Sequence, residues 1–171
     1  MTSCYMAIGE GWQRLALPAI LIGLSSLSAF ATEKHALGFD IVISLSAKAE
    51  AAISSTHEGI SLSATYYGDP HPGDEKHTNA MGMVDLGAED IDLPAGTRTV
   101  HVTGHTVGAD RLRLISGGAK VNVSVFSARK SHEDNILDCD FIDGPVSELT
   151  HEPVHLHCFL ISENGETELK P

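Results

Sequence analysis

The sequence predicts an all-β protein whose antiparallel strands form a β-sandwich, with one or two short helices. Most of its apolar segments alternate with polar residues at a period of two, as expected for strands that bury one face. Turn-forming Gly, Pro, Asn and Asp residues separate these segments at short intervals. Many short strands, few helices and an export signal are together typical of a secreted sandwich domain.

The export signal is an apolar run near the start, Leu15–Ala31, with the sequence LALPAILIGLSSLSAFA. Its apolar core is too short for a membrane-spanning helix, which needs about 20 residues. The run ends in Ala29-Phe30-Ala31, which matches an A-x-A cleavage site. We therefore expect residues 1–31 to be a signal peptide and residues 32–171 to be one domain, located in the periplasm or outside the cell.

The first part of this domain is expected to contain two strands around a short helix. Phe39–Leu45 alternates between apolar and polar residues, and Ile60–Gly68 does the same. Between them, Ala47–Ser54 is rich in helix formers and follows Ser46, a favoured N-cap residue. The segment Asp69–Gly82 is expected to be a loop because it contains two Pro, two Gly and many polar residues.

The middle of the chain predicts shorter strands. Met83–Leu86 and Glu89–Leu93 are two candidates that Gly87 separates. Thr97–Thr103 is rich in β-branched residues and is a further strand. Ala109–Ile115 fits either a helical turn or a short strand.

The last part of the chain contains the clearest strand, Ala119–Ser127, in which valines alternate with polar residues. Asn135–Ile142 and Pro153–Ile161 are the remaining strand candidates, and a loop over residues 144–152 divides them. The polar tail after Glu163 is expected to fray.

An Ig-like or transthyretin-like arrangement of these strands would fit the pattern. No Trp lies between the two cysteines of the expected domain, which disfavours a domain of the antibody type. A small closed β-barrel is the alternative architecture.

The composition limits the possible partners. The formal net charge is −12, and an acidic surface disfavours nucleic acid and anionic membranes because each phosphate contact requires a cation. We expect a domain that is not embedded in a membrane and that suits cationic partners or metal ions.

The cysteine count predicts one disulfide. Cys4 would leave with the signal peptide, so only Cys139 and Cys158 remain. An even pair in an oxidising compartment indicates a disulfide, and the alternation places both sulfurs on apolar faces. The bond would close a loop of about 18 residues and stabilise the domain by roughly 3 kcal/mol.

The disulfide in turn suggests a metal site. If the two cysteines pair across antiparallel strands, His155 and His157 would face Asp138 and Asp140 on the outer side. Two imidazoles and two carboxylates can bind Zn²⁺ or Cu²⁺, although the same residues also form ordinary surface pairs.

A second candidate site is the loop beside the strand Ile60–Gly68. It combines aromatic, acidic and His side chains that could hold a sugar, a cation or a basic peptide. The candidate ligand residues are Tyr66, Tyr67, Asp69, His71, Asp74, Glu75 and His77.

Catalytic motifs were not found in the sequence. It contains no G-x-S-x-G elbow, P-loop or dinucleotide fingerprint, and His101 and His105 lack the Glu of H-E-x-x-H. The triplet Asn122-Val-Ser124 matches the N-glycosylation sequon. We therefore expect a non-enzymatic module without a cofactor that engages a protein, peptide or glycan, and a periplasmic Zn- or Cu-binding protein is the alternative.

Overall fold

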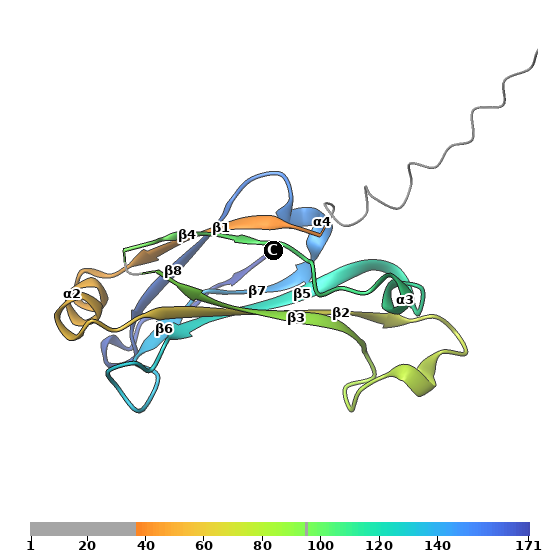
Figure 1. Cartoon of the computed structure of the whole chain (residues 1–171), viewed down its shortest axis with the longest axis horizontal. Coiled ribbons are helices and arrows are strands. Elements are labelled where there is room, and N and C mark those ends of the chain that lie inside the picture. Colours follow the sequence, from red (N-terminus) through yellow and green to blue (C-terminus); the bar gives the residue numbers. More distant parts are fainter. Residues whose placement is uncertain (1–36, 95) are drawn as a thin grey trace, which may run out of the picture.

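Two β-sheets pack against each other in residues 37–94 and 96–171, which are the residues that this computed structural model describes (Figure 1). The four-stranded sheet has the order β4-β1-β8-β6, and the five-stranded sheet has the order β3-β2-β5-β7-β9. The strands are β1 (Phe39–Leu45), β2 (Ile60–Pro70), β3 (Val84–Leu93), β4 (Thr99–Val102), β5 (Ile115–Ser127), β6 (Leu137–Cys139), β7 (Phe141–Pro145), β8 (Val154–Leu160) and β9 (Leu169–Lys170). The predicted all-β sandwich is confirmed, and the expected signal peptide lies outside the described residues.

Short helices lie at the two ends of the sandwich. Helix α2 (Ala47–Thr56) covers one end, and α3 (Ala109–Leu112) lies at the other (Figure 1). Ser46 is the N-cap of α2, and its hydroxyl accepts a hydrogen bond from the Ala49 amide at 3.1 Å, as predicted. Helix α4 (Val146–Leu149) lies in the segment that was expected to be a loop. The 3₁₀ turns are η1 (Glu75–His77) and η2 (Ile161–Glu163).

Both sheets are mixed, whereas the sequence predicted antiparallel strands. β8 runs parallel to β1, and β9 runs parallel to β7; the other pairs are antiparallel. A period-two pattern shows which face of a strand is buried, but it carries no information on the direction of the neighbouring strand. These two parallel pairs were therefore not visible in the alternation.

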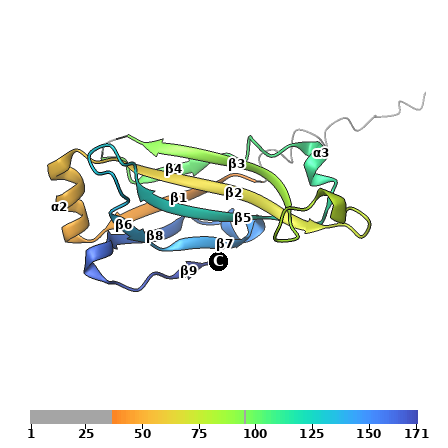
Figure 2. The same ribbon diagram turned by 90° about the horizontal axis from the view of Figure 1, so that it is seen from below.

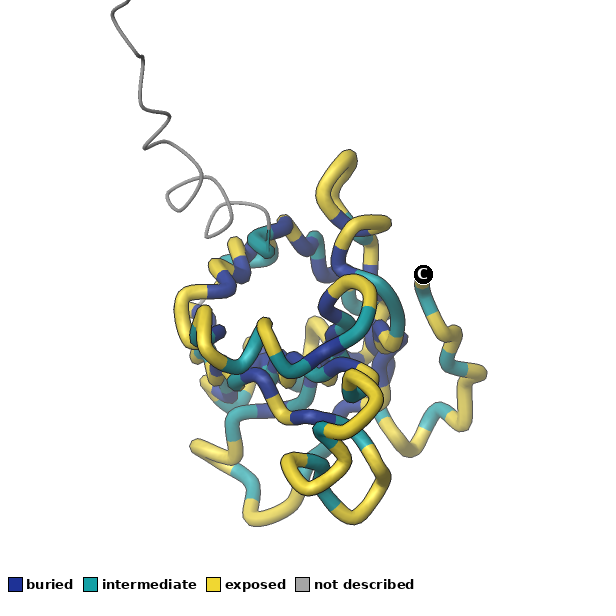
Figure 3. The backbone as a smooth tube through the Cα atoms, turned by 90° about the vertical axis from the view of Figure 1, so that its right-hand side faces the viewer, coloured by how far each residue is buried: buried dark blue, intermediate teal, exposed yellow. Residues whose placement is uncertain are grey.

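The core consists of the inward side chains of both sheets. In Figure 3 the tube alternates between buried and exposed along the strands, and it is exposed over the protruding loops. Each fully buried Val, Leu or Ile contributes about 1.5–3 kcal/mol relative to an exposed position. Fully buried members include Ile41, Ile43, Leu62, Val121, Val123, Ile142 and Leu156.

Strand β3 is continuous, although Gly87 was expected to divide it. Tyr66 pairs with Gly87 and Tyr67 pairs with Asp85, so Leu86 is the extra residue of a β-bulge. Gly87 has φ +155°, and a Cβ there would lie only 2.7 Å from the Thr106 carbonyl oxygen. The glycine thus permits a close approach of the backbone instead of ending the strand.

The expected strand Asn135–Ile142 is in fact two strands that belong to different sheets. β6 pairs with β8, and β7 pairs with β5, so the chain crosses between the sheets at Asp140. The crossing reverses the alternation: Asp140 is buried and Phe141 is exposed, whereas the continuous strand predicted the opposite. The prediction was wrong because it assumed a single sheet.

The C-terminal tail is paired, whereas we expected it to fray. Leu169 and Lys170 form β9 beside β7, and the Glu168 amide donates to the buried carboxylate of Asp140 at 2.9 Å. Phe159 alternates in phase with the exposed His155 and His157, yet it is 7% exposed, and a Cβ at Gly165 would lie 2.7 Å from its ring. The tail therefore covers one side of β8.

No helix within the described residues is long and apolar enough to cross a membrane.

Candidate functional site

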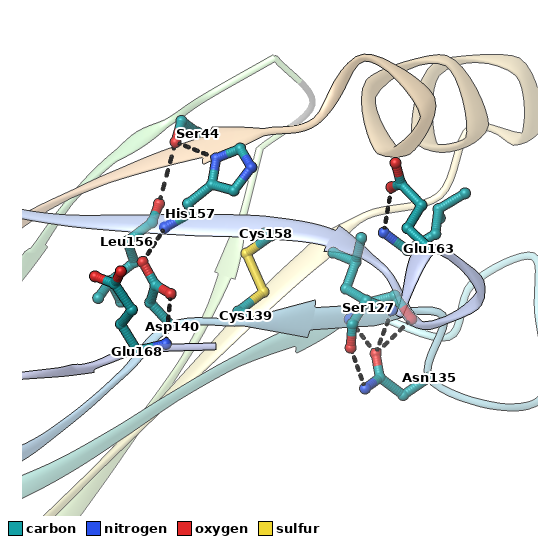
Figure 4. Close-up of a disulfide and its surroundings, with 12 residues drawn as sticks. Ser44, Ser127, Asn135, Cys139, Asp140, Leu156, His157, Cys158, Glu163 and Glu168 are labelled. Carbon is teal, nitrogen blue, oxygen red and sulfur yellow. Dashed lines mark hydrogen bonds between the residues drawn. A yellow bond between two sulfur atoms is a disulfide. The ribbon is translucent and has the colours of Figure 1, made fainter. Parts of the chain in front are cut away.

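The predicted cysteine pair lies within disulfide distance. Cys139 on β6 is the direct partner of Cys158 on β8, with 4.0 Å between the Cα atoms and 2.03 Å between the sulfurs (Figure 4). Both residues are buried, as the alternation predicted. The bond links the edge strand β6 to the interior of its sheet.

The predicted metal ligands are not gathered into one site. The carboxylate of Asp140 accepts the backbone N–H groups of His157 at 3.0 Å and Glu168 at 2.9 Å (Figure 4). His155 and His157 are exposed on β8, and His157 Nδ1 lies 2.9 Å from the hydroxyl of Ser44. Asp138 remains exposed on β6. In the described part of the chain, no three His, Cys, Asp or Glu side chains converge as metal ligands.

The two tyrosines of the predicted ligand loop differ in their environment. Tyr66 is fully buried in the core, and its hydroxyl donates to the Leu37 carbonyl at 3.2 Å, so it cannot line a surface site. Tyr67 is turned to the outer face, where its hydroxyl donates to Asp143. Burial and the Asp143 hydrogen bond raise the pKa of Tyr67 to about 12.

The other predicted loop residues are spread over the end of β2 and the loop that follows it. Asp69 belongs to β2 instead of the loop, and its carboxylate accepts Lys120 Nζ at 2.8 Å. The Glu75 carboxylate accepts the Gly73 amide at 3.0 Å, and this bond holds the pKa of Glu75 below its usual value. His71 and His77 are exposed, and Asp74 is half-buried. These side chains are not gathered around a common point.

His101 lies beside a shallow cavity of about 210 Å³. Its Nδ1 is 2.8 Å from Asp40 Oδ1, and His151 and Glu152 line the same cavity. Both members of the His101–Asp40 pair are more than half exposed, so the pair makes only a small contribution to stability.

A buried polar cluster that the sequence analysis missed lies between β3 and β4. The side chain of Glu89 is 3% exposed, and its Oε2 accepts the Thr103 amide at 3.1 Å and the Thr103 hydroxyl at 3.0 Å. His105 Nδ1 lies 2.6 Å from that hydroxyl and 3.5 Å from Glu89 Oε2. A sequence signal did exist, because Glu89 alternates in phase with Ile91 and Leu93.

Thr103 and Glu89 both lie near the same nitrogen of His105, Nδ1. The hydroxyl and the carboxylate therefore face the same ring nitrogen. A nucleophile–His–acid triad needs them on opposite nitrogens, so this geometry does not form one.

Close to this cluster, β3 forms the long outer edge of the five-stranded sheet (Figure 2). The segment after β4 covers its first half, where Arg111 Nε donates to the Asp85 carbonyl at 2.8 Å. From Ala88 to Leu93, no strand of the described chain pairs with the side that faces away from β2. The other edge strands, β4, β6 and β9, have four, three and two residues.

The outer face of this open edge is acidic. Asp90 and Asp92 are exposed there, opposite Ser63 and Ser61 of β2. The Asp92 carboxylate accepts the Ser61 hydroxyl and lies 4.0 Å from Lys130 Nζ, whereas Asp90 makes no side-chain hydrogen bond or ion pair within the described residues. The open edge (Ala88–Leu93) thus combines unpaired backbone groups with negative charge.

Comparisons of the chain with protein-family profiles, curated proteins and solved structures found no match.

Proposed function

We propose that this chain is an exported, non-enzymatic binding module that adds a basic, extended segment of a protein or peptide to the open edge of β3. One observation carries the proposal: Ala88–Leu93 is an open stretch on the only long edge strand of the described sheets. Strand addition uses the free backbone N–H and C=O groups of such an edge for affinity, and it uses the flanking side chains for specificity.

The charge at the edge supports a basic occupant. A second copy of β3 would bring Asp90 and Asp92 against like charges, which destabilises a strand pair. Lys or Arg side chains at these positions would form cross-strand pairs with the carboxylates. The net charge of −12 would also steer a cationic segment toward the protein.

The cysteine pair supports the exported location. Disulfides persist in oxidising compartments such as the periplasm and the extracellular space, and they are rare in the cytosol. Cys139 and Cys158 lie at bonding distance in a buried position.

The direct test measures binding of a short synthetic peptide in which Lys alternates with Val and Thr, by fluorescence anisotropy at low salt. A matched peptide with Glu in place of Lys is expected not to bind. Replacing Asp90→Asn and Asp92→Asn together should weaken binding by roughly 2- to 10-fold, because each exposed pair contributes little.

The matched control neutralises two acidic residues away from the edge, Asp138→Asn on β6 and Glu148→Gln on α4, and should leave the affinity unchanged. In amide NMR spectra, the peptide should shift the signals of Ala88–Leu93. The proposal fails if the Lys peptide does not bind, if the Glu peptide binds equally well, or if only glycans bind.

A further inference from the structure

One carboxylate oxygen of Glu89 is buried and has no hydrogen-bond partner in the described residues. Its Oε1 is the only buried side-chain nitrogen or oxygen in the described residues that lacks a hydrogen-bond partner. The other oxygen, Oε2, receives both donors from Thr103. An unsatisfied buried polar atom is costly, so such an atom calls for an explanation, and a ligand that supplies a donor is one.

The position of Glu89 connects this oxygen with the open edge. Glu89 belongs to the open stretch Ala88–Leu93, but its side chain points into the sandwich instead of outward with Asp90. The side chain of His105, whose Nδ1 lies 3.5 Å from Glu89 Oε2, is 66% exposed, so the buried carboxylate lies next to a side chain that reaches solvent. A strand added to β3 would direct every second side chain toward this side of the sheet.

We propose that Glu89 receives one Lys or Arg side chain of the basic segment that binds to β3, and this inference rests on the proposed function. A cation is the best partner for a buried carboxylate, because a charge-assisted hydrogen bond is about twice as strong as a neutral one. The acidic outer face selects basic residues at alternate positions of the segment, whereas Glu89 selects one at a position that points inward.

A different role for Glu89 makes a different prediction. Inward-pointing charges on edge strands also prevent unwanted pairing between copies of a protein. In that role Glu89 would repel other strands, and its removal would leave peptide affinity unchanged or raise it. Measuring the coupling between Glu89 and individual lysines separates the two roles.

The experiment is a double-mutant cycle between wild type and Glu89→Gln on the protein and Lys→norleucine replacements along a second set of synthetic peptides. These keep the alternating lysines and carry one additional Lys, placed in turn at each Val or Thr position that faces inward. In wild type, one inward lysine should matter most, and its loss should weaken binding by roughly 30-fold or more. Glu89→Gln should cause a similar loss and should remove the dependence on that lysine. Asp90→Asn is the control, because it should not couple to the inward lysine.

The outcomes separate this inference from the proposed function. If the peptide binds and depends on Asp90 and Asp92 but Glu89→Gln binds as tightly as wild type, the Glu89 site is wrong and the edge site stands. A loss of affinity without coupling to any single lysine would also overturn the Glu89 site. If no peptide binds to wild type, both proposals fail. Should Glu89→Gln not fold, Glu89→Asp keeps the charge and withdraws the carboxylate, with the same expected loss of coupling.

Discussion

At the scale of single residues, buried carboxylates in this protein bind backbone amides. Glu58 has a fully buried side chain that accepts the N–H groups of Lys130, Ser131 and His132 at 2.8–3.1 Å. Burial alone raises the pKa of Glu58, but these hydrogen bonds outweigh it and hold the pKa far below its usual range. One side chain thus ties the loop after β5 to the start of β2.

Glu58 should make the stability of the protein depend on pH. Because its pKa is lowered by folding, its contribution is present above the usual value of 4.5 and is lost as the pH falls below it. Glu58→Gln should lower the free energy of unfolding at pH 6 by about 1–3 kcal/mol, and it should reduce the loss of stability between pH 6 and pH 3. Urea denaturation at both pH values measures this.

The control for this prediction is Glu148→Gln, an exposed change on α4 that should leave both values within about 0.5 kcal/mol of wild type. Equal pH dependence in wild type and Glu58→Gln would contradict the assignment.

At the scale of elements, a covalent bond fastens the short edge strand β6 to the four-stranded sheet. β6 has three residues and, within the described part of the chain, pairs only with β8, so its ladder is short. The bond between Cys139, the last residue of β6, and Cys158 of β8 adds a covalent link to this ladder (Figure 4).

Replacing both cysteines by Ser should lower the melting temperature by several degrees, as expected from a loss of about 3 kcal/mol. Differential scanning calorimetry measures the shift, and reduction of the wild type should reproduce it. Free thiols at Cys139 and Cys158 in the native protein would show that no bond forms.

The terminal strand β9 should also contribute to stability. Burial alone raises the pKa of Asp140, but the amides of His157 and Glu168 and the charge of Lys170 bring the pKa below its usual value. Deleting residues 166–171 leaves one oxygen of this buried carboxylate without its donor, at a cost of about 1–3 kcal/mol. Chemical denaturation measures this cost.

The control is Lys170→Met, which removes only the charge. It should lower the free energy of unfolding by less than the deletion does. A truncated chain that is as stable as the full chain would mean that the tail frays after all.

At the scale of the whole molecule, net charge governs association. A chain with a charge of −12 attracts a cationic peptide over distances comparable to the Debye length, about 8 Å at physiological ionic strength. Once the peptide is bound to the open edge, its lysines form short-range ion pairs with Asp90 and Asp92. Salt screens these pairs less than it screens the long-range attraction.

We therefore expect the association rate of the Lys peptide to fall steeply between 20 mM and 500 mM NaCl while its dissociation rate changes little. Stopped-flow fluorescence measures both rates. A dissociation rate that carries most of the salt dependence would contradict long-range steering.

The sequence by itself determined the strands and the face that most of them bury. The alternation of apolar and polar residues depends only on neighbours in the chain. It therefore identified β1, β5, β8 and the buried cysteine pair, and the preference of Ser for helix N-termini identified the Ser46 cap. It also placed Glu89 in phase with Ile91 and Leu93, although we attached no function to it.

Only the tertiary structure decided which strands are neighbours. The parallel pairs, the crossing between sheets at Asp140 and the return of the tail to β7 depend on contacts between residues far apart in the chain. The candidate sites depend on packing in the same way: Tyr66 and Asp140 have the predicted chemistry, but packing turns both side chains inward. The open edge of β3 likewise exists because no other strand among the described residues reaches it, and no local pattern encodes the absence of a neighbour.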